Sequence, residues 1–428
     1  MTLPQAVRLL IATYILLLIN SCTRDPIITS INNADLIIVD TVLYNIDSFT
    51  YQIPPDVGTL PNLYFGSESG YNCRFTLVNI SSQATDNSTT FQSFIDTTVG
   101  IERIDSVFFI MTSPDTFLAD DAGTYHLLVY PDADLDSVFS EGSGNYLNID
   151  TSTIVGLFGT PLATTLMTKI EDTVATHPLI KFDLTDSKDI IIQQFADTIG
   201  GVKNRSLVIW HDENNTGISE FYSRNANNNL PRLEVQFRKI VGIDSLQNDI
   251  IDTLAKSFYP DKDVSIIYPP LITVADTSAI SIGRAKGLQA ILSVVVNTQT
   301  LPKEAVIRSA ELTLYQDSLY SDINGFTAGV YSIDTAYTDV LPYPISYPIH
   351  DDPIDRQIDL PDPVVSANQV VFELRNLLGA VALGQVNNYG IKLFSTSAND
   401  PFEIAHFEKD TAISNAFRPS LRVIYVSP

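Results

Sequence analysis

Short runs of β-branched and aromatic residues, separated by turn residues, recur along almost the whole chain and restrict its fold more than any other feature. Runs of this length and composition are typical of strands in antiparallel sheets that pack face to face. Segments with helical periodicity are few. We therefore expect an all-β protein, whose clearest strand-like runs are residues 36–39, 106–111, 126–130 and 207–210.

The strand-like runs repeat as a set, because four landmarks occur in the same order in each half of the chain. Residues 63–66 with 74–77 correspond to 280–283 with 291–294, 104–109 to 307–314, 206–210 to 390–394, and 221–237 to 406–425. This order predicts two tandem jelly-roll-like antiparallel β-sandwiches, residues 36–239 and 243–428. Each should carry one short helix, at residues 191–199 and 372–381.

Several of these landmarks resemble a known family. Each half closes on a strand of the pattern Pro-x-Leu-x-Val-x-Phe/Tyr (231–237 and 419–425), and the second half adds the segments 308–314 and 387–393. The pattern resembles the DNRLRE family of bacterial extracellular domains over most of 280–428 and, more weakly, over 60–237. The resemblance implies jelly-roll sandwiches related to carbohydrate-binding modules, in secreted or lipid-anchored proteins. Both copies lack the family's usual tryptophan, and Tyr337 occupies that place in the second.

The N-terminus has the pattern of a targeting signal. An apolar run, residues 9–19, follows Arg8 and is shorter than the roughly 20 residues that span a bilayer. It ends in Ile19-Asn20-Ser21-Cys22, which resembles a bacterial lipobox, although a secreted protein can also carry a cysteine near its cleavage site. We predict a signal peptide at 1–21, lipidation of Cys22 and a tether at 22–35. The protein would then be lipid-anchored in the cell envelope, at the outer membrane on its periplasmic or surface face.

Charge and cysteine content exclude several classes of protein. The chain has 50 Asp and Glu against 25 Lys and Arg, a net charge of −25 that disfavours nucleic acid as a partner. Two cysteines and five histidines are too few for a disulfide framework or a CxxC-type zinc site. Cys73 lies in an alternating strand pattern, which indicates a buried, unreactive thiol.

Catalytic signatures are missing from the sequence. It contains no Gly-x-Ser-x-Gly elbow, Walker A loop, GxGxxG turn or HExxH helix, so we expect no enzymatic activity. A polysaccharide-degrading enzyme remains a third hypothesis, and it would need a cleft with paired carboxylates.

A proline-rich stretch in the second half is the best ligand-facing candidate. It contains Tyr337, Tyr343, Tyr347, His350 and Asp351 among four prolines. Aromatic faces can stack on sugar rings, and carboxylates accept hydrogen bonds from hydroxyl groups. The alternative is a loop packed over one end of the sandwich with its tyrosines half-buried.

Two acidic turns could hold a structural calcium ion, which prefers oxygen ligands. The better one places Asp212, Asn214 and Thr216 at the first, third and fifth positions and Gly217 at the sixth. The other is residues 132–136. Ordinary acidic turns are the alternative for both.

The single tryptophan, Trp210, lies at the end of a strand, where a core or rim position is favoured over a binding platform. Together these features predict a non-enzymatic envelope lipoprotein that binds or retains a polysaccharide through tandem sandwiches. The alternative is a structural or docking lipoprotein that contacts other envelope proteins. The negative charge favours neutral glycans or glycans bridged by calcium.

Overall fold

Antiparallel sheets make up most of the protein, which confirms the expected all-β class. The computed structural model describes residues 37–44, 46–86, 88–96, 99–114, 123–130, 139–149, 151–167, 177–196, 205–212, 217–244, 248–294, 301–303, 305–317, 326–333, 362–366, 368–398, 400–409 and 417–427. Within them, no helix is long and apolar enough to cross a membrane.

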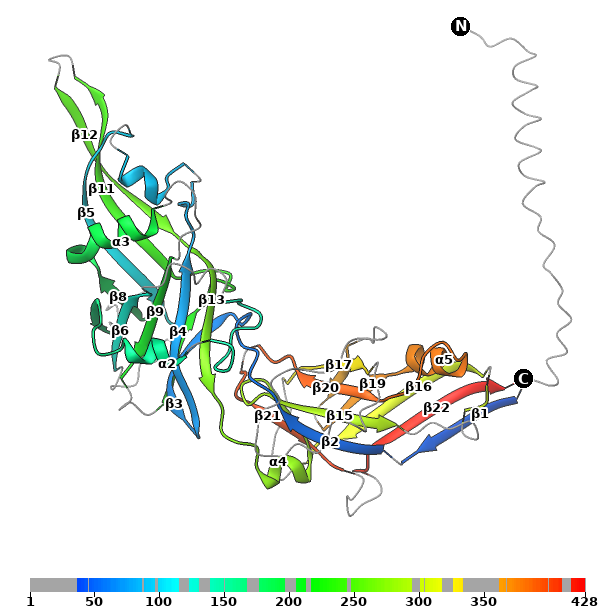
Figure 1. Ribbon diagram of the computed structural model, residues 1–428. Coiled ribbons are helices and arrows are strands. Elements are labelled where there is room, and N and C mark those ends of the chain that lie inside the picture. Colours follow the sequence, from blue (N-terminus) through cyan, green and yellow to red (C-terminus); the bar gives the residue numbers. More distant parts are fainter. Residues whose placement is uncertain are drawn as a thin grey trace, which may run out of the picture.

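The strands form two bodies, each built from two facing sheets (Figure 1). The first sandwich joins the sheet β10-β3-β4-β9-β6-β7, with β13 paired to β4, to the sheet β12-β11-β5-β8. Its strands are β3 (Asn62–Glu68), β4 (Tyr71–Ile80), β5 (Ile101–Thr112), β6 (Thr124–Val129), β7 (Ala163–Leu166), β8 (Leu179–Asp183), β9 (Ser206–His211), β10 (Gly217–Tyr222), β11 (Arg232–Ile243), β12 (Asp249–Phe258) and β13 (Pro260–Tyr268).

The second sandwich joins the sheet β17-β20-β15-β14-β21, with β2 paired to β15, to the sheet β1-β22-β16-β19-β18. Its strands are β1 (Ile37–Leu43), β2 (Ile46–Gln52), β14 (Ile280–Gly283), β15 (Leu288–Val294), β16 (Val306–Tyr315), β17 (Ala328–Ser332), β18 (Val364–Ser366), β19 (Gln369–Glu373), β20 (Ile391–Ser395), β21 (Ile404–Phe407) and β22 (Ser420–Ser427).

Short helices close the ends of the sandwiches. The two expected helices are present, as α3 (Lys188–Phe195) and α5 (Arg375–Ala382). Their apolar side chains, including Phe195 and Leu378, join the two main cores because they recur on one helix face. More helix forms than expected, as α2 (Thr151–Gly156), α4 (Val274–Ser278), η2 (Phe91–Phe94) and η5 (Thr185–Ser187).

Each sandwich buries its own core between its sheets. Alternating residues of the strands point inward, so that Phe65, Phe109 and Phe182 lie in the first core and Leu292 and Leu312 in the second. A further cluster covers the outer face of β4, β9 and β13, where the segment 139–158 packs on the sheet. The single free cysteine of the described residues, Cys73, is buried, as expected, and burial raises the pKa of its thiol.

The path of the chain between the sandwiches corrects the expected boundaries at 36–239 and 243–428. Residues 62–268 form the first sandwich, whereas the second combines residues 37–52 with 280–427. Strand β1 pairs with β22 from the other end of the chain, Ile37 opposite Ser427. Because β1 and β22 lie near opposite ends of the sequence, a comparison of the first half with the second could not detect that they pair.

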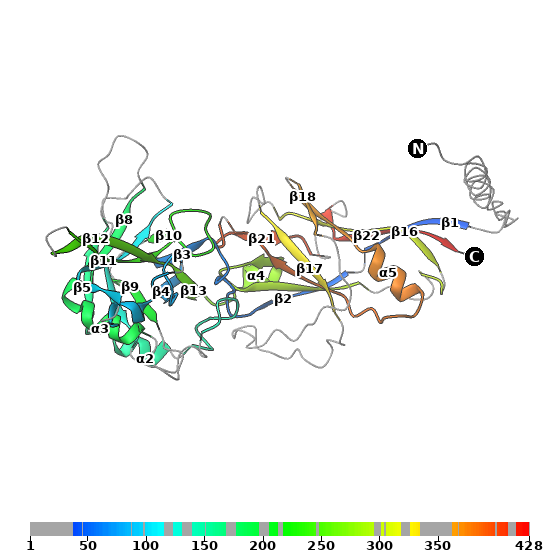
Figure 2. The same ribbon diagram turned by 90° about the horizontal axis from the view of Figure 1, so that it is seen from above.

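The two sandwiches lie end to end (Figure 2). At their junction, Phe402 of the second contacts Tyr64 and Tyr71 of the first edge-on, at 5.2 and 5.1 Å between ring centroids. Strand β1 begins and strand β22 ends at the far side of the second sandwich, so the described chain starts and finishes there (Figure 1). The ribbon of β11 and β12 projects from the opposite end of the molecule, beyond the first sandwich.

Candidate functional site

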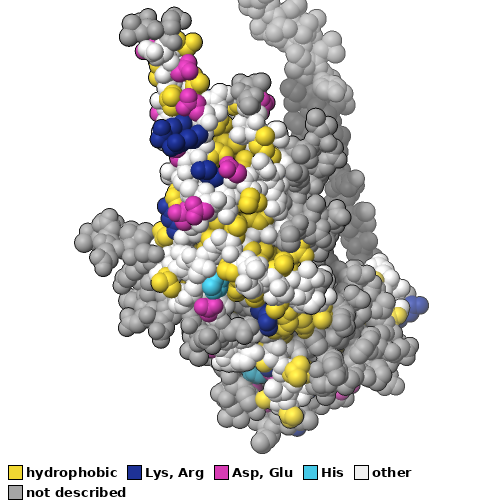
Figure 3. All heavy atoms as spheres, turned by 60° about the vertical axis from the view of Figure 1, so that its left-hand side comes forward, with side chains coloured by type: hydrophobic (Ala, Val, Ile, Leu, Met, Phe, Trp, Pro, Cys, Tyr) yellow, Lys and Arg dark blue, Asp and Glu magenta, His cyan; other side chains and the backbone are white. Residues whose placement is uncertain are grey.

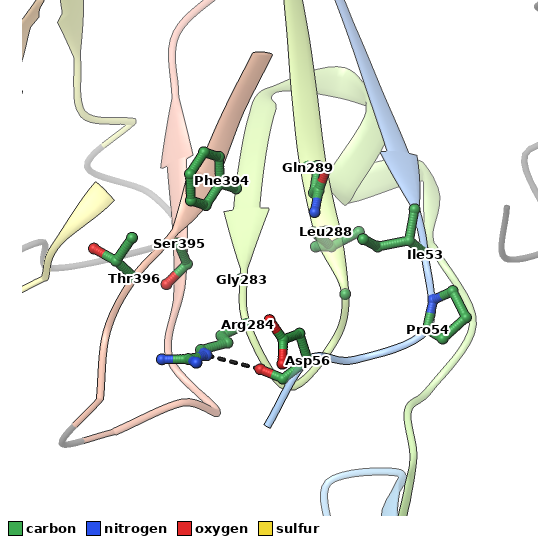
Figure 4. A pocket seen from close by; sticks show the side chains of 11 residues that line it. Ile53, Pro54, Asp56, Gly283, Arg284, Leu288, Gln289, Phe394, Ser395 and Thr396 are labelled. Atoms are coloured by element: carbon green, nitrogen blue, oxygen red, sulfur yellow. Dashed lines mark hydrogen bonds between the residues drawn. The ribbon is translucent and has the colours of Figure 1, made fainter. Parts of the chain in front are cut away.

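A groove opens where the two sandwiches meet, close to the crossing segment that follows β2 (Figure 4). Its narrow part has a cavity volume of about 130 Å³ and its wider part about 430 Å³. Both parts are lined by Ile53, Pro54, Asp56, Gln289 and Phe394. The first sandwich contributes residues 142–148 to the wider part, so the groove has walls from both bodies.

Aromatic side chains form one wall of the groove. Phe394 on β20 and Tyr331 on β17 lie 4.7 Å apart between ring centroids. Gly329 lies opposite Phe394 in the strand register, and a Cβ atom at this glycine would come within 2.4 Å of the ring. The glycine therefore gives the Phe394 ring the space in which it lies across the sheet.

A lysine lies beneath these two rings. Lys392 Nζ is 5.4 Å from the Tyr331 centroid and 5.6 Å from the Phe394 centroid, within reach of a cation–π attraction. Only 4% of Lys392 is exposed, although it lines the wider part of the groove. Buried lysines are rare unless their charge is balanced by neighbours, which makes this residue unusual for a strand whose role is packing.

Amide groups supply the polar surface of the groove. The Gln289 Oε1 atom accepts a hydrogen bond of 2.8 Å from the Tyr51 hydroxyl, which orients this amide. On the opposite wall, the Asn145 N–H donates to Asn148 Oδ1 at 2.8 Å, and Asn148 Nδ2 donates to the Ser143 carbonyl. These bonds hold the loop against itself and place two asparagines at the rim.

Arg284 and Gly287 fix the floor of the narrow part. Arg284 Nε donates to the Asp56 carbonyl at 2.8 Å (Figure 4). Its Nη2 atom donates to Thr59 Oγ1 at 3.1 Å. Gly287 has a φ of +69°, and its added Cβ would lie 1.9 Å from the Ile53 carbonyl oxygen. Glycine is needed here because the crossing segment runs directly over this turn.

A buried carboxylate supports the loop that carries the asparagines. Asp263 on β13 accepts the Arg224 N–H at 2.7 Å through Oδ2, while Oδ1 has no hydrogen-bond partner among the described residues. Burial, with the nearby Glu141 adding to it, raises the pKa of Asp263 to about 7. Glu141 in turn binds the Arg224 guanidinium at 3.3 Å and Asn225 Nδ2 at 3.0 Å, which ties the loop to the first sandwich.

A second hollow, of about 640 Å³, lies on the first sandwich beside Trp210. The Trp210 indole is 5% exposed and stacks on Phe158, with 4.4 Å between centroids and 2° between planes. Phe158 therefore covers a face of the indole on which a ligand ring would otherwise stack. The structure places Trp210 at the rim of this hollow and within the outer cluster, in agreement with the favoured interpretation.

The candidate calcium turn has one member among the described residues. Asp212 Oδ1 lies 2.8 Å from His126 Nε2, and His126 Nδ1 lies 2.9 Å from Thr164 Oγ1. The Asp212 carboxylate therefore already has a partner. Asn214 and Thr216 lie outside the described residues, and the described side chains include no group of three or more His, Cys, Asp or Glu placed to hold a metal ion.

Most other predicted site residues lie outside the part of the chain that the structure describes. These are Cys22, Tyr337, Tyr343, Tyr347, His350 and Asp351. Sequence reasoning did not single out the groove residues, because Lys392 and Phe394 lie in the repeat segment 390–394 and Gln289 lies just before the repeat segment 291–294. Lys392 was the available signal, since a lysine interrupts the apolar run 391–394.

Comparison with known proteins gave no relatives: no family model, curated protein or solved structure matches this chain.

Proposed function

We propose that this protein is a lipid-anchored, non-enzymatic component of the bacterial cell envelope that holds a polysaccharide in the groove between its sandwiches. The observation that carries the proposal is the pair of rings, Phe394 and Tyr331, above Lys392 and beside the oriented Gln289 amide. Aromatic rings offer flat apolar surfaces to the C–H faces of sugars, and amide groups exchange hydrogen bonds with hydroxyl groups.

The charge of the chain restricts the glycan that fits. A net charge of −25 repels polyanions before they reach the groove, so a neutral polysaccharide, or an acidic one bridged by calcium, is the expected ligand. Lys392 beneath the rings adds a positive charge with N–H donors to this wall, which suits the oxygen atoms of sugar hydroxyl groups as well as an anion.

The groove position suits a chain anchored through Cys22. The described chain begins at Ile37, at the pole of the second sandwich, and the groove lies at the other end of that sandwich. A lipid at Cys22 would hold the second sandwich next to the membrane, with the groove and the first sandwich farther out.

Binding measurements on soluble residues 24–428 test the proposal. A panel of neutral and acidic polysaccharides, with calcium and with chelator, should include at least one ligand with saturable binding in calorimetry. Phe394→Ala should weaken that binding tenfold or more, while Val364→Ala, at an exposed position on β18, should leave it unchanged.

One further variant separates the groove from the site predicted by sequence alone. If a Tyr343→Ala/Tyr347→Ala variant loses binding and Phe394→Ala does not, the site is the proline-rich stretch and the groove assignment is wrong. If no polysaccharide binds under any condition, the function itself is wrong.

The second candidate function, docking of another envelope protein, is favoured by the projecting ribbon. Val241, Ile243, Ile250 and Ile251 are each about half exposed near its tip (Figure 3). Aliphatic side chains gathered on a projecting two-stranded ribbon are typical of an interaction surface. Crosslinking in intact envelopes should then capture a partner that an Ile243→Ser/Ile250→Ser variant loses, with glycan binding unaffected.

A further inference from the structure

Two equivalent arms complete the two sandwiches, where an arm is two strands that are consecutive in the chain and lie in the two opposite sheets of one sandwich. In the first, β12 pairs with the closing strand β11 and β13 pairs with the free edge of β4. In the second, β1 pairs with the closing strand β22 and β2 with the free edge of β15. The neighbouring strands correspond as well, because β10-β3-β4-β9-β6 and β21-β14-β15-β20-β17 follow the same order.

The sequences of the two arms support this equivalence. Each carries an Asp-Thr pair in its first strand, at 40–41 and 252–253, and each is followed by two prolines, at 54–55 and 269–270. In chain order, each arm directly precedes the strands of the sandwich that it does not join. Arm β12–β13 directly follows β11 of its own sandwich, whereas arm β1–β2 is separated from the other strands of the second sandwich by the whole first sandwich.

The side-chain contacts that anchor the N-terminal arm β1–β2 lie in the second sandwich and the segment that leads into it. Thr50 Oγ1 donates to the Ala279 carbonyl at 3.2 Å, and Gln52 Nε2 donates to the carbonyls of Lys286 and Pro270 at 2.8 and 2.9 Å. Ile46 enters the second core. A second copy of the chain presents the same acceptors, so an arm from one copy would find every one of these contacts in another.

Of the two arms, only β1–β2 is free to leave its sandwich. Arm β12–β13 is joined on both sides to strands that must stay in place, through residues 244–248 and 269–279. Arm β1–β2 is the first element of the described chain and is joined to the following strands through residues 53–61. A terminal element on a single connecting segment is the arrangement that domain swapping requires.

We propose that the N-terminal arm β1–β2 is exchanged between copies of this protein, so that each arm completes the second sandwich of a neighbouring chain. The arm makes the same strand pairs and side-chain bonds in either arrangement, and the balance between the two arrangements is set by the connecting segment and the local concentration. Copies held close together, as on one membrane surface, favour the exchanged form. The partner is a second copy of this chain.

Engineered cysteines at opposed, outward-facing positions test the exchange in soluble residues 24–428. Ile38 on β1 is largely exposed and lies opposite Val426 on β22. An Ile38→Cys chain and a Val426→Cys chain, with tags of different size, are mixed at high concentration, warmed to just below the melting temperature, cooled and oxidised. We expect a disulfide-linked heterodimer, because only exchange places these two positions together across chains. The buried native Cys73 stays unreactive.

Two controls define the outcomes. A double variant, Ile38→Cys/Val426→Cys, should form a disulfide within one chain when oxidised at low concentration, which shows that the pair has suitable geometry. Val364→Cys replaces Val426→Cys in a parallel mixture, because Val364 is exposed on a strand remote from β1 in the sheet order. A heterodimer yield at least tenfold above this collision control supports exchange. An equal yield in the two mixtures overturns it.

Discussion

Lys286 and Asp276 form an ion pair of 2.7 Å in the second sandwich, next to the segment that crosses from the first, and neither side chain is more than 7% exposed. The same Asp276 oxygen accepts the N–H and the hydroxyl of Thr273, at 2.6 and 2.7 Å, in the capping box of α4. Burial alone would raise the pKa of Asp276, but the bonds from Lys286 and Thr273 outweigh it, so the pKa is lowered.

Asp276→Asn should destabilise the protein strongly. It leaves the Lys286 ammonium buried without a counter-charge, and breaking one partner of a buried pair costs about 3–5 kcal/mol. Urea denaturation at pH 7 measures the loss. In Asp276→Asn/Lys286→Met, where neither charge remains, we expect much of the stability to return. A single variant within about 1 kcal/mol of the wild type would contradict the importance of this pair.

Asp263 should make stability depend on pH in the direction opposite to an ordinary paired carboxylate. Its pKa is about 7 in the folded protein against an ordinary value of 3.8, so the folded state binds the proton more tightly. The stabilisation is fully present below about pH 4 and is lost as the pH rises to about 7, at up to about 1.4 kcal/mol per pH unit.

Asp263→Asn isolates this contribution, because asparagine keeps an oxygen for the Arg224 N–H and cannot ionise. The stability of the variant minus that of the wild type should grow between pH 4 and 7 and level off above. Subtracting one free energy of unfolding from the other removes the pH dependence that comes from the carboxylates both proteins share. A difference that is flat with pH would show that Asp263 does not titrate in this range.

Gly287→Ala should disturb the groove floor and lower stability. A non-glycine residue at φ +69° costs roughly 1–2 kcal/mol, and the added methyl group meets the Ile53 carbonyl oxygen at 1.9 Å. Thermal unfolding should show the loss. Gly159→Ala is the matched control, since its added Cβ meets no atom within 4 Å, and it should unfold at nearly the wild-type temperature.

Trp210→Ala should affect stability and leave glycan binding intact. The indole packs against Phe158 in the outer cluster, and truncation of a buried large aromatic side chain costs about 3–5 kcal/mol. Trp210→Phe, which keeps an aromatic ring at this position, should lose less stability. If Trp210→Phe folds as stably as the wild type but binds glycan tenfold more weakly, Trp210 belongs to a binding site after all.

Much of the fold could be predicted from the sequence, because strand composition and alternation are local properties. The runs at 106–111 and 207–210 became β5 and β9, and the periodic segments near 191 and 375 became α3 and α5. The pairing of β1 with β22 and of β2 with β15 could not be predicted. A free sheet edge accepts a strand through backbone bonds that any sequence can make, so its partner leaves little trace in residue identity.

The candidate site was harder to predict for a related reason. Phe394 and Gln289 read as ordinary strand residues, and their position beside Asn145 follows from how two sandwiches meet. The proline-rich stretch gave a stronger pattern in the sequence, yet it lies outside the described residues, so its role stays a prediction.

The antiparallel pairing of Ile37 with Ser427 also determines how the protein would carry a mechanical load. The described chain begins at the outer end of β1, and this strand runs inward along β22 toward the groove and the first sandwich (Figure 1). A pull between the outer end of β1 and the first sandwich therefore acts along the strand axis. The backbone hydrogen bonds between β1 and β22 would resist this pull together in shear, and they would not break one after another.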